Sequence, residues 1–324
     1  MKAVVFQAPR QMSVADLPRP EIGPDEVLIA SRAVGICHSD FEVLDGHYII
    51  PVSFPVTPGH EWAGEVAEVG REVAALRPGD RVVGECVIAP DHHFGLSSNG
   101  AAAEYFKVRP EWLHLLPDEL SWSQGALVEP FTVAHYATHA ANGVDASDTV
   151  VIFGAGPIGQ CCVAATVGRG ARALVVDPVP ERREVAVQIG AEAGLDPATD
   201  DLAGQVRQLT KGRGAEVVFE ASGNPAAISS ALEVAGREAR VVCIGINVVA
   251  KAEVPMGLIQ SKALRIRGIV GSPNVWPAAL RFLARTGVDL TRIVTAAFPL
   301  ALGSEAFAAA RNTDENIKVH IVNH

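Results

Sequence analysis

A strand, a glycine-punctuated turn, a helix and a second strand ending in an acid occupy residues 149–177, and this run constrains the fold more than any other part of the chain. The first strand is predicted at residues 149–153, the turn at 154–159 and the second strand at 173–176, which leads directly to Asp177. A glycine turn between a strand and a helix, with an acid about twenty residues further on, is the sequence context of a dinucleotide-binding unit. We therefore predict a dinucleotide site in this half of the chain.

The residues of the turn have distinct physical roles in such a unit. Gly154 permits a tight turn, Gly156 lets the backbone approach a pyrophosphate, and Gly159 lets the helix pack closely on the strand. Pro157 and Ile158 open the helix, whose N-terminus offers N–H groups to the phosphates. These residues form the predicted phosphate-binding part of the cofactor site.

The acid at the end of the second strand bears on which cofactor is bound. Asp177 is predicted to accept hydrogen bonds from the ribose hydroxyls, and its carboxylate would repel the 2′-phosphate of NADP, so NAD is favoured. Arg182 and Arg183 follow shortly after, and Arg182 is included among the candidate cofactor-binding residues. Because an arginine there could reach a 2′-phosphate, NADP remains open.

Length, charge and cysteine content narrow the class of protein. A chain of 324 residues exceeds what one hydrophobic core usually organises, so two domains are expected. The formal net charge of −10 disfavours nucleic acid and anionic membranes as partners and leaves small molecules. No apolar run is long enough for a signal peptide or a membrane span, and the five cysteines fit no disulfide framework. We predict a cytoplasmic protein in which one thiol has a metal or catalytic role.

The pattern of apolar residues divides the chain. The first ~120 residues carry short alternating runs broken by proline and glycine, which predict antiparallel strands. From residue 146 strands and helices alternate, which predicts an α/β fold with a doubly wound parallel sheet. We place a β-rich domain at 1–140 with 271–324, and the cofactor domain at 141–270. Strands are predicted at 217–220, 240–245, 264–268 and 317–322, with the last returning to the first domain, and helices at 123–142 and 278–285.

Residues with metal-ligand chemistry occur at three separated places in the β-rich domain. These are Cys37 with its neighbours, the pair His60 and Glu61, and Glu129 before a proline. Catalytic zinc sites gather their ligands from distant loops, so no spacing rule links the three. Taken singly, the cysteine could be a core residue, the histidine structural and Glu129 a charge at a helix N-terminus.

Four ordered motifs together resemble the zinc-dependent medium-chain alcohol dehydrogenases over nearly the whole chain. The likeness implies a GroES-like catalytic domain beside a Rossmann domain that binds NAD. Glu129 with Pro130, where liver-type relatives have a cysteine, is similar to the polyol branch that includes sorbitol and threonine dehydrogenases. The motifs are Cys-His-Ser-Asp at 37–40, Gly-His-Glu-Trp-Ala-Gly-Glu-Val at 59–66, Pro-Gly-Asp-Arg-Val at 78–82 and the glycine turn at 154–159.

The resemblance implies one catalytic zinc ion per chain. Cys37 and His60 would be its ligands, and Glu61 and Glu129 would share or exchange the remaining protein position. Asp40 would fix the ring of His60. The structural zinc of most relatives is expected to be absent, because residues 85–100 contain only Cys86. The other cysteines, at 161, 162 and 243, are predicted to be core residues.

The same resemblance assigns catalytic roles. Zinc in this family polarises the substrate hydroxyl, which eases hydride transfer to nicotinamide. Cys37, Ser39 and His60 are the predicted catalytic residues, with Ser39 passing the hydroxyl proton outward. His38 would face the cofactor pyrophosphate. Glu42 stands where several relatives have a histidine, which leaves the later relay steps open.

The expected substrate is the secondary alcohol, or its ketone, of a polyol, sugar, cyclitol or amino-cyclitol, with threonine also open. Candidate pocket residues are His47, Tyr48, His92, His93 and Asn274. Two alternatives remain: a zinc-free NADPH-dependent quinone or enoyl reductase of the same fold, and a non-catalytic cofactor-binding protein. The resemblance also implies a homodimer or homotetramer.

Overall fold

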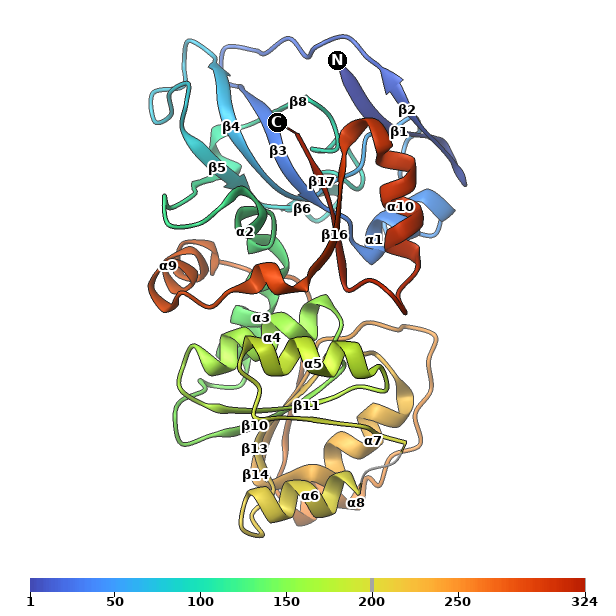
Figure 1. The fold of residues 1–324 in the computed structure, drawn as a ribbon, viewed down its shortest axis with the longest axis vertical. Helices are drawn as coiled ribbons and strands as arrows, with labels where there is room; N and C mark the ends of the chain where they lie inside the picture. Colours follow the sequence, from blue (N-terminus) through green and yellow to red (C-terminus); the bar gives the residue numbers. More distant parts are fainter. Residues whose placement is uncertain (199–200, 324) are drawn as a thin grey trace. The chain divides into compact units, whose positions relative to one another are not determined.

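The computed structural model describes residues 1–198 and 201–323, and it divides the chain into two compact units (Figure 1). The first unit comprises Met1–Glu129, Trp276–Arg285 and Val294–His324, and the second comprises Pro130–Val275 and Thr286–Ile293. No helix among the described residues is long and apolar enough to cross a membrane.

The first unit is built on a seven-stranded sheet with the order β16-β17-β3-β4-β5-β9, and β8 pairs with β3 outside that path. Its buried core includes Phe6, Ile29, Trp62 and Ile321. The strands of this sheet are β3 (Val27–Gly35), β4 (Glu61–Val69), β5 (Arg81–Gly84), β8 (Tyr105–Val108), β9 (Leu113–Leu115), β16 (Val294–Pro299) and β17 (Lys318–Val322). Two further pairs of strands form separate two-stranded sheets: β1 (Lys2–Ala8) with β2 (Gln11–Asp16), and β6 (Val87–Ala89) with β7 (His92–His93).

Short helices follow or cover these strands. Helix α1 (His38–Asp45) comes directly after β3, and α10 (Gly303–Arg311) contacts β16 and β17. Helix α2 (Trp122–Ala126) contacts β3 and β4, and α9 spans Trp276–Thr286. The helix predicted at 123–142 is in fact two, because Leu127 separates α2 from α3 (Val128–Ala140). Glu129 therefore lies in the first turn of its own helix.

The C-terminal strand returns to the first unit, as the sequence predicted. β17 pairs antiparallel with β3, with His320 opposite Gly35, and parallel with β16. The charged residue Lys318 lies at the start of this strand and is 2% exposed. The pairing with β3 thus brings the end of the chain beside the segment that leads into Cys37.

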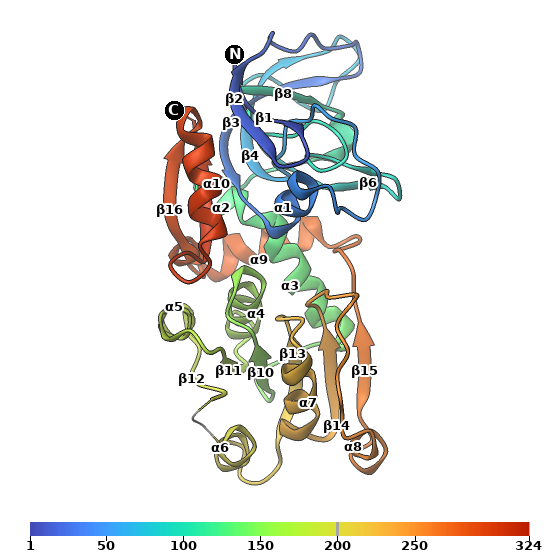
Figure 2. The same cartoon turned by 90° about the vertical axis from the view of Figure 1, so that its right-hand side faces the viewer.

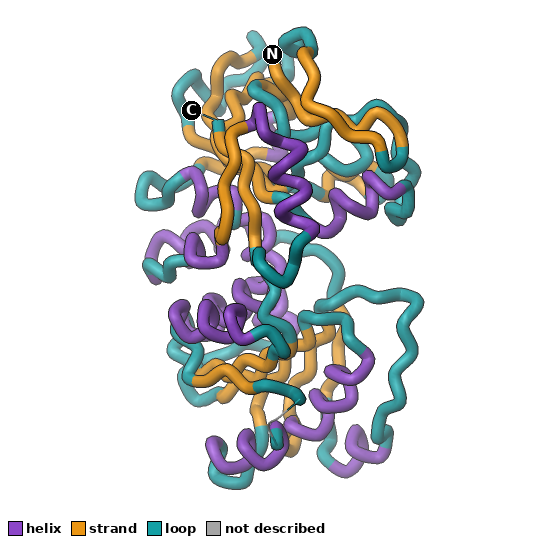
Figure 3. The backbone as a smooth tube through the Cα atoms, turned by 45° about the vertical axis from the view of Figure 1, so that its right-hand side comes forward, coloured by secondary structure: helices purple, strands orange, loops and turns teal. Residues whose placement is uncertain are grey.

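The second unit is a six-stranded parallel sheet with the order β12-β11-β10-β13-β14-β15 (Figure 2). Counted from the central β10, this is the doubly wound order of dinucleotide-binding folds, so the predicted fold class is confirmed. The strands are β10 (Thr149–Phe153), β11 (Arg172–Val176), β12 (Ala193–Leu195), β13 (Ala215–Glu220), β14 (Ala235–Cys243) and β15 (Arg265–Gly268), and the helices are α4 (Pro157–Val167), α5 (Pro180–Ile189), α6 (Leu202–Leu209), α7 (Pro225–Val234) and α8 (Gly257–Ser261). Figure 3 shows the strands of this unit flanked by its helices.

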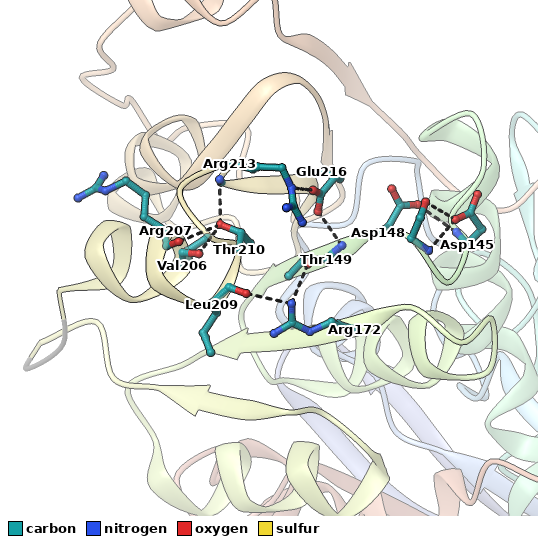
Figure 4. A network of polar contacts seen from close by, with 12 residues as sticks. Asp145, Asp148, Thr149, Arg172, Val206, Arg207, Leu209, Thr210, Arg213 and Glu216 are labelled. Atoms are coloured by element: carbon teal, nitrogen blue, oxygen red, sulfur yellow. Dashed lines mark hydrogen bonds and ion pairs between the residues drawn. The ribbon is translucent and has the colours of Figure 1, made fainter.

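A polar network holds the amino ends of these strands (Figure 4). The N–H of Thr149 donates to Glu216 Oε2 at 2.8 Å, and Arg172 Nη1 donates to the carbonyl of Leu209 at 3.0 Å. Thr210 Oγ1 accepts from the N–H of Gly214 at 2.9 Å. Because β10 ends in the glycine turn, fixing its start also fixes where that turn lies.

Candidate active site

Three side chains with metal-ligand chemistry meet in the first unit. Cys37 is the N-cap of α1, while His60 and Glu61 lie where β4 begins. One possible ligand atom from each residue lies within 4.8 Å of the others. Zinc–ligand distances of about 2.0–2.3 Å place the ligand atoms of a tetrahedral site roughly 3.3–3.8 Å apart. Small side-chain shifts would therefore close these three around one zinc ion.

Two glycines make this convergence possible. A Cβ on Gly35 would lie 2.4 Å from Glu61 Oε2, so only glycine leaves room for the carboxylate beside β3. Gly59 has φ +104°, and a Cβ there would lie 2.8 Å from the amide nitrogen of Ala102. A side chain at Gly59 would be strained and would clash with backbone, so glycine fixes the turn that presents His60.

Asp40 links Cys37 and His60. Its Oδ2 accepts from the N–H of Cys37 at 2.8 Å, and its Oδ1 lies 3.4 Å from His60 Nδ1. Neither Asp40 Oδ1 nor His60 Nδ1 has a well-formed hydrogen bond in the described structure. Because Nδ1 faces Asp40, Nε2 is the nitrogen left for a metal, which is the arrangement that orients histidine ligands.

The charges around His60 act strongly on its proton. Burial by itself lowers the pKa of His60, but the influence of Asp40, Cys86 and Cys37 together outweighs burial, and the pKa lies well above its ordinary value. The imidazole therefore lies in a field that favours a positive charge. A bound cation would supply such a charge.

Lys318 is a site residue that sequence reasoning missed. Its Nζ donates to both carboxylate oxygens of Glu61, at 2.6 and 2.9 Å, and to the carbonyl of Ile36 at 3.1 Å. The two side chains are 1% and 2% exposed. A carboxylate has about four acceptor sites, so the lysine leaves room on Glu61 for a metal. A lysine inside an otherwise apolar terminal strand was the available signal.

Glu129 interacts electrostatically with His60 and Glu61 but is not one of the three residues whose ligand atoms lie within 4.8 Å of one another. Burial raises the pKa of Glu129 to about 7; the charge of His60 opposes this rise and that of Glu61 adds to it. A buried carboxylate that is costly to ionise is stabilised when a cation is bound nearby. Cys37, His60, Glu61 and Glu129 thus supply thiolate, imidazole and carboxylate donors that fit zinc.

The other residues predicted for this site lie in the first turn of α1. Cys37 Sγ donates to Ser39 Oγ at 3.8 Å, so the hydroxyl of Ser39 adjoins the candidate metal ligand. His38 is exposed and Ser39 half-buried. Cys86, the one cysteine of the shortened lobe, is buried and donates to the carbonyl of Phe94 at 3.7 Å.

The glycine turn in the second unit has the predicted backbone geometry. Gly154 has φ +90°, and a Cβ on Gly159 would lie 1.8 Å from the carbonyl oxygen of Gly154. A Cβ on Gly156 would meet nothing within 4 Å, which leaves its face of the turn open. Gly156 is the N-cap of α4, which begins with Pro157 and Ile158. Cys161 and Cys162 are buried along α4 as predicted.

Asp177 is tied to this turn. Its Oδ2 accepts from the N–H of Ala155 at 2.7 Å, and its Oδ1 accepts from the N–H of Val179 at 2.9 Å. Arg183 donates to the carbonyl of Asp177 at 2.6 Å and pairs with Asp196 at 3.6 Å. The carbonyl of Arg182 accepts from Gln160 Nε2 at 2.8 Å. The side chain of Arg183 is therefore engaged on the protein itself.

Comparison with known proteins gives matches to both parts of the chain. Residues 157–285 match the family model described as zinc-binding dehydrogenase, and residues 23–118 match that of the alcohol dehydrogenase GroES-like domain. The sorbitol dehydrogenase of Bacillus subtilis (strain 168) is 34% identical in sequence to this chain, over 96% of this chain and 93% of the length of that enzyme. The D-arabitol-phosphate dehydrogenase of Enterococcus avium is 32% identical, over 99% of this chain and 97% of its own.

Solved structures give the same picture. The crystal structure of 2R,3R-butanediol dehydrogenase from Bacillus subtilis superposes with a TM-score of 0.91 and 31% identity, covering 100% of this chain and 99% of that one. The crystal structure of galactitol-1-phosphate dehydrogenase from Escherichia coli superposes with a TM-score of 0.88 and 26% identity, covering 100% of both chains.

Proposed function

This chain belongs to the zinc-binding dehydrogenase family, and from that premise we propose that it is an NAD-dependent dehydrogenase of a polyol, sugar, cyclitol or amino-cyclitol. The reaction is hydride transfer between a secondary alcohol and nicotinamide, which yields a ketone. The observation that carries the proposal is the convergence of Cys37, His60 and Glu61 from separate segments, with ligand atoms within 4.8 Å of one another.

The metal-binding roles follow from the donor set. Cys37 and His60 would hold zinc, and Glu61 or Glu129 would provide the third protein ligand. When bound, the ion would act as a Lewis acid on the substrate hydroxyl. Asp40 orients the ring of His60, and Lys318 holds the carboxylate of Glu61 in place.

Ser39 is the residue proposed to move the substrate proton. Its hydroxyl can donate one hydrogen bond and accept another, and it lies 3.8 Å from Cys37 Sγ. It can therefore accept the proton of a substrate hydroxyl held beside Cys37 while donating its own proton outward.

The choice of NAD rests on Asp177 and Arg183. The carboxylate of Asp177 is fixed at the turn by two backbone N–H groups, where its charge repels a 2′-phosphate. Arg183 pairs with Asp196, so it is held away from the role of a 2′-phosphate ligand. His38 and Arg182 are also proposed to contact the cofactor.

An oxidation screen tests the activity. Polyols and cyclitols would be supplied with NAD or NADP, and the absorbance of the reduced cofactor followed with and without a zinc chelator. We expect NAD-dependent oxidation that the chelator abolishes and that added zinc restores. Oxidation insensitive to the chelator would instead favour a zinc-free reductase, and the absence of turnover on every alcohol would reject the proposed activity.

We also propose a homodimer or homotetramer. β15 is an edge strand of the parallel sheet, and its Ile266 is 43% exposed. Unpaired edge strands invite pairing with another chain. Sedimentation analysis should give a mass of two or four chains, and a monomer at micromolar concentration would contradict the proposal.

A further inference from the structure

The loop that follows β7 packs directly on the backbone that presents His60. A Cβ on Gly95 would lie 2.5 Å from the carbonyl carbon of Gly59 and 2.7 Å from the amide nitrogen of His60. The N–H of Ala101 donates to the carbonyl of Gly59 at 2.9 Å. His93 precedes Gly95 by two residues, so it belongs to the segment that this contact fixes.

Tyr48 meets His93 from the other side. It follows α1, the helix that begins after Cys37, and its Oη lies 2.6 Å from His93 Nδ1. The two rings are in edge-to-face contact with centroids 5.9 Å apart. The charge of His60 acts on both side chains, and that of Cys37 also acts on Tyr48. Both residues are half-buried, so a small molecule can reach them.

The position of His93 is also fixed through its backbone. Its N–H donates to Ser97 Oγ at 2.8 Å, and the hydroxyl of Ser97 donates to the carbonyl of His93 at 3.3 Å. The adjacent His92 is held by Ser98 Oγ at 2.9 Å. A side chain fixed in this way loses little further freedom when it binds a ligand.

The pair is neutral at physiological pH. Burial raises the pKa of Tyr48 well above its ordinary value, and burial together with the charge of His60 lowers the pKa of His93 below its ordinary value. Tyr48 therefore keeps its proton, and Oη and Nδ1 share one hydrogen bond in which either the hydroxyl or the ring N–H donates. Within residues 1–198 and 201–323, no ion pair joins either side chain to a lysine or arginine. In either arrangement the pair offers a ligand one donor and one acceptor: Nε2–H with Oη, or the hydroxyl of Tyr48 with Nε2.

We propose that Tyr48 and His93 bind a second hydroxyl group of the substrate and select an unphosphorylated diol or polyol. A hydroxyl group both donates and accepts one hydrogen bond, which matches what the pair offers. A phosphate group would need a cation, which the pair lacks. A monohydric alcohol would leave the pair without a partner. This inference rests on the proposed alcohol dehydrogenase activity and names its substrate class.

The test compares substrates that differ by one group. Wild-type protein, Tyr48→Phe, His93→Leu and the double variant would be assayed with 2,3-butanediol, 2-butanol, sorbitol and sorbitol 6-phosphate. Tyr105→Phe removes the same hydroxyl from a tyrosine that packs on Arg19 instead, and it is the matched control. Zinc content and the unfolding midpoint of each variant would be measured alongside, because a structural defect would change them.

We expect Tyr48→Phe to lower kcat/KM about tenfold on 2,3-butanediol and sorbitol, mainly through KM, and to change 2-butanol less than about twofold. The double variant should lose less than the product of the two single losses, because both remove the same contact. Tyr105→Phe should match the wild type. Equal losses on diol and monohydric alcohol, or a wild-type preference for the phosphorylated substrate, would overturn the inference while leaving the dehydrogenase intact. Absence of wild-type turnover on every alcohol would reject the proposed function, and the inference with it.

Discussion

The glycine turn of the second unit and the candidate metal cluster of the first unit differ in how their parts are brought together. The turn is one continuous stretch, and a strand and a helix on either side fix its geometry. The cluster draws Cys37, His60 and Glu129 from separate segments, and Lys318 from the last strand. A contiguous site such as the turn therefore depends on local backbone conformation, whereas a dispersed site such as the cluster depends on buried charges that compensate one another.

The substitution Cys37→Ser is expected to have the largest effect and to distinguish the metal cluster of the first unit from the glycine turn of the second. Loss of the thiolate should remove zinc and lower kcat/KM by about 10³-fold or more, since a Lewis acid contributes several kcal/mol to such a reaction. Equilibrium binding of NAD, which depends on the second unit, should stay within about twofold. Elemental analysis and cofactor titration measure the two effects. Full activity in the variant would remove Cys37 from the site.

Lys318→Met tests the compensation of charge within the cluster. It leaves the carboxylate of Glu61 buried without its partner, which should lower the free energy of unfolding by about 3 kcal/mol. Urea unfolding in the presence of a chelator would measure this change.

Lys2→Met is the matched control for this variant, because Lys2 pairs with Asp16 at the surface and its loss should have little effect. Adding Glu61→Gln to Lys318→Met should recover part of the lost stability. If Lys318→Met and Lys2→Met behave alike, the buried pair has no special role.

Asp177→Asn addresses the glycine turn. The variant keeps an acceptor oxygen for the N–H of Ala155 but loses the negative charge that is proposed to repel a 2′-phosphate. The ratio of kcat/KM for NAD over NADP should fall about tenfold, since hydrogen bonds to charged groups contribute about 1.5–3 kcal/mol. Steady-state kinetics with both cofactors would show it. An equal loss with both would mean that Asp177 only supports the turn.

The smallest expected effect concerns His320, which is buried on β17 and contacts Ser123 Oγ through Nδ1 at 3.2 Å. Burial, aided by the charge of Lys318, lowers the pKa of His320 to about 4. His320 binds a proton more readily in the unfolded chain than in the folded one. The free energy of unfolding should therefore fall as pH falls from about 6.5 towards about 4. His320→Gln should reduce that slope by at most about 1.4 kcal/mol per pH unit in unfolding titrations. An unchanged slope would show that His320 is already protonated.

Much of the fold could be predicted from patterns of neighbouring residues. The parallel strands β10, β11 and β13 and the glycine turn were located because apolar runs and glycines are local signals. The return of β17 to the first unit was also predicted and is confirmed by its pairing with β3. The break at Leu127 between α2 and α3 was missed, although Gly125 and Pro130 lie on either side of it and both are poor residues for a helix interior.

The site was predicted less completely, and for a different reason. Cys37, His60, Glu61 and Glu129 were named through resemblance to a family, since each taken singly has an ordinary structural explanation. Lys318 gave only a weak local signal, a lysine within a largely apolar strand, and the pairing of Tyr48 with His93 gave none, because both interactions join distant segments. Their roles, like those of the proposed ligands, stay predictions until the variants are measured.

The sequence by itself determined the doubly wound unit and its glycine turn, because strand, turn and helix preferences act between residues that are neighbours in the chain. Only the tertiary structure decided that Lys318 pairs with Glu61 and that the loop at Gly95 packs on the backbone of His60. The physical reason is that the energy of a buried charge or hydrogen bond depends on which groups surround it in space, and those groups come from segments that are separated in the chain.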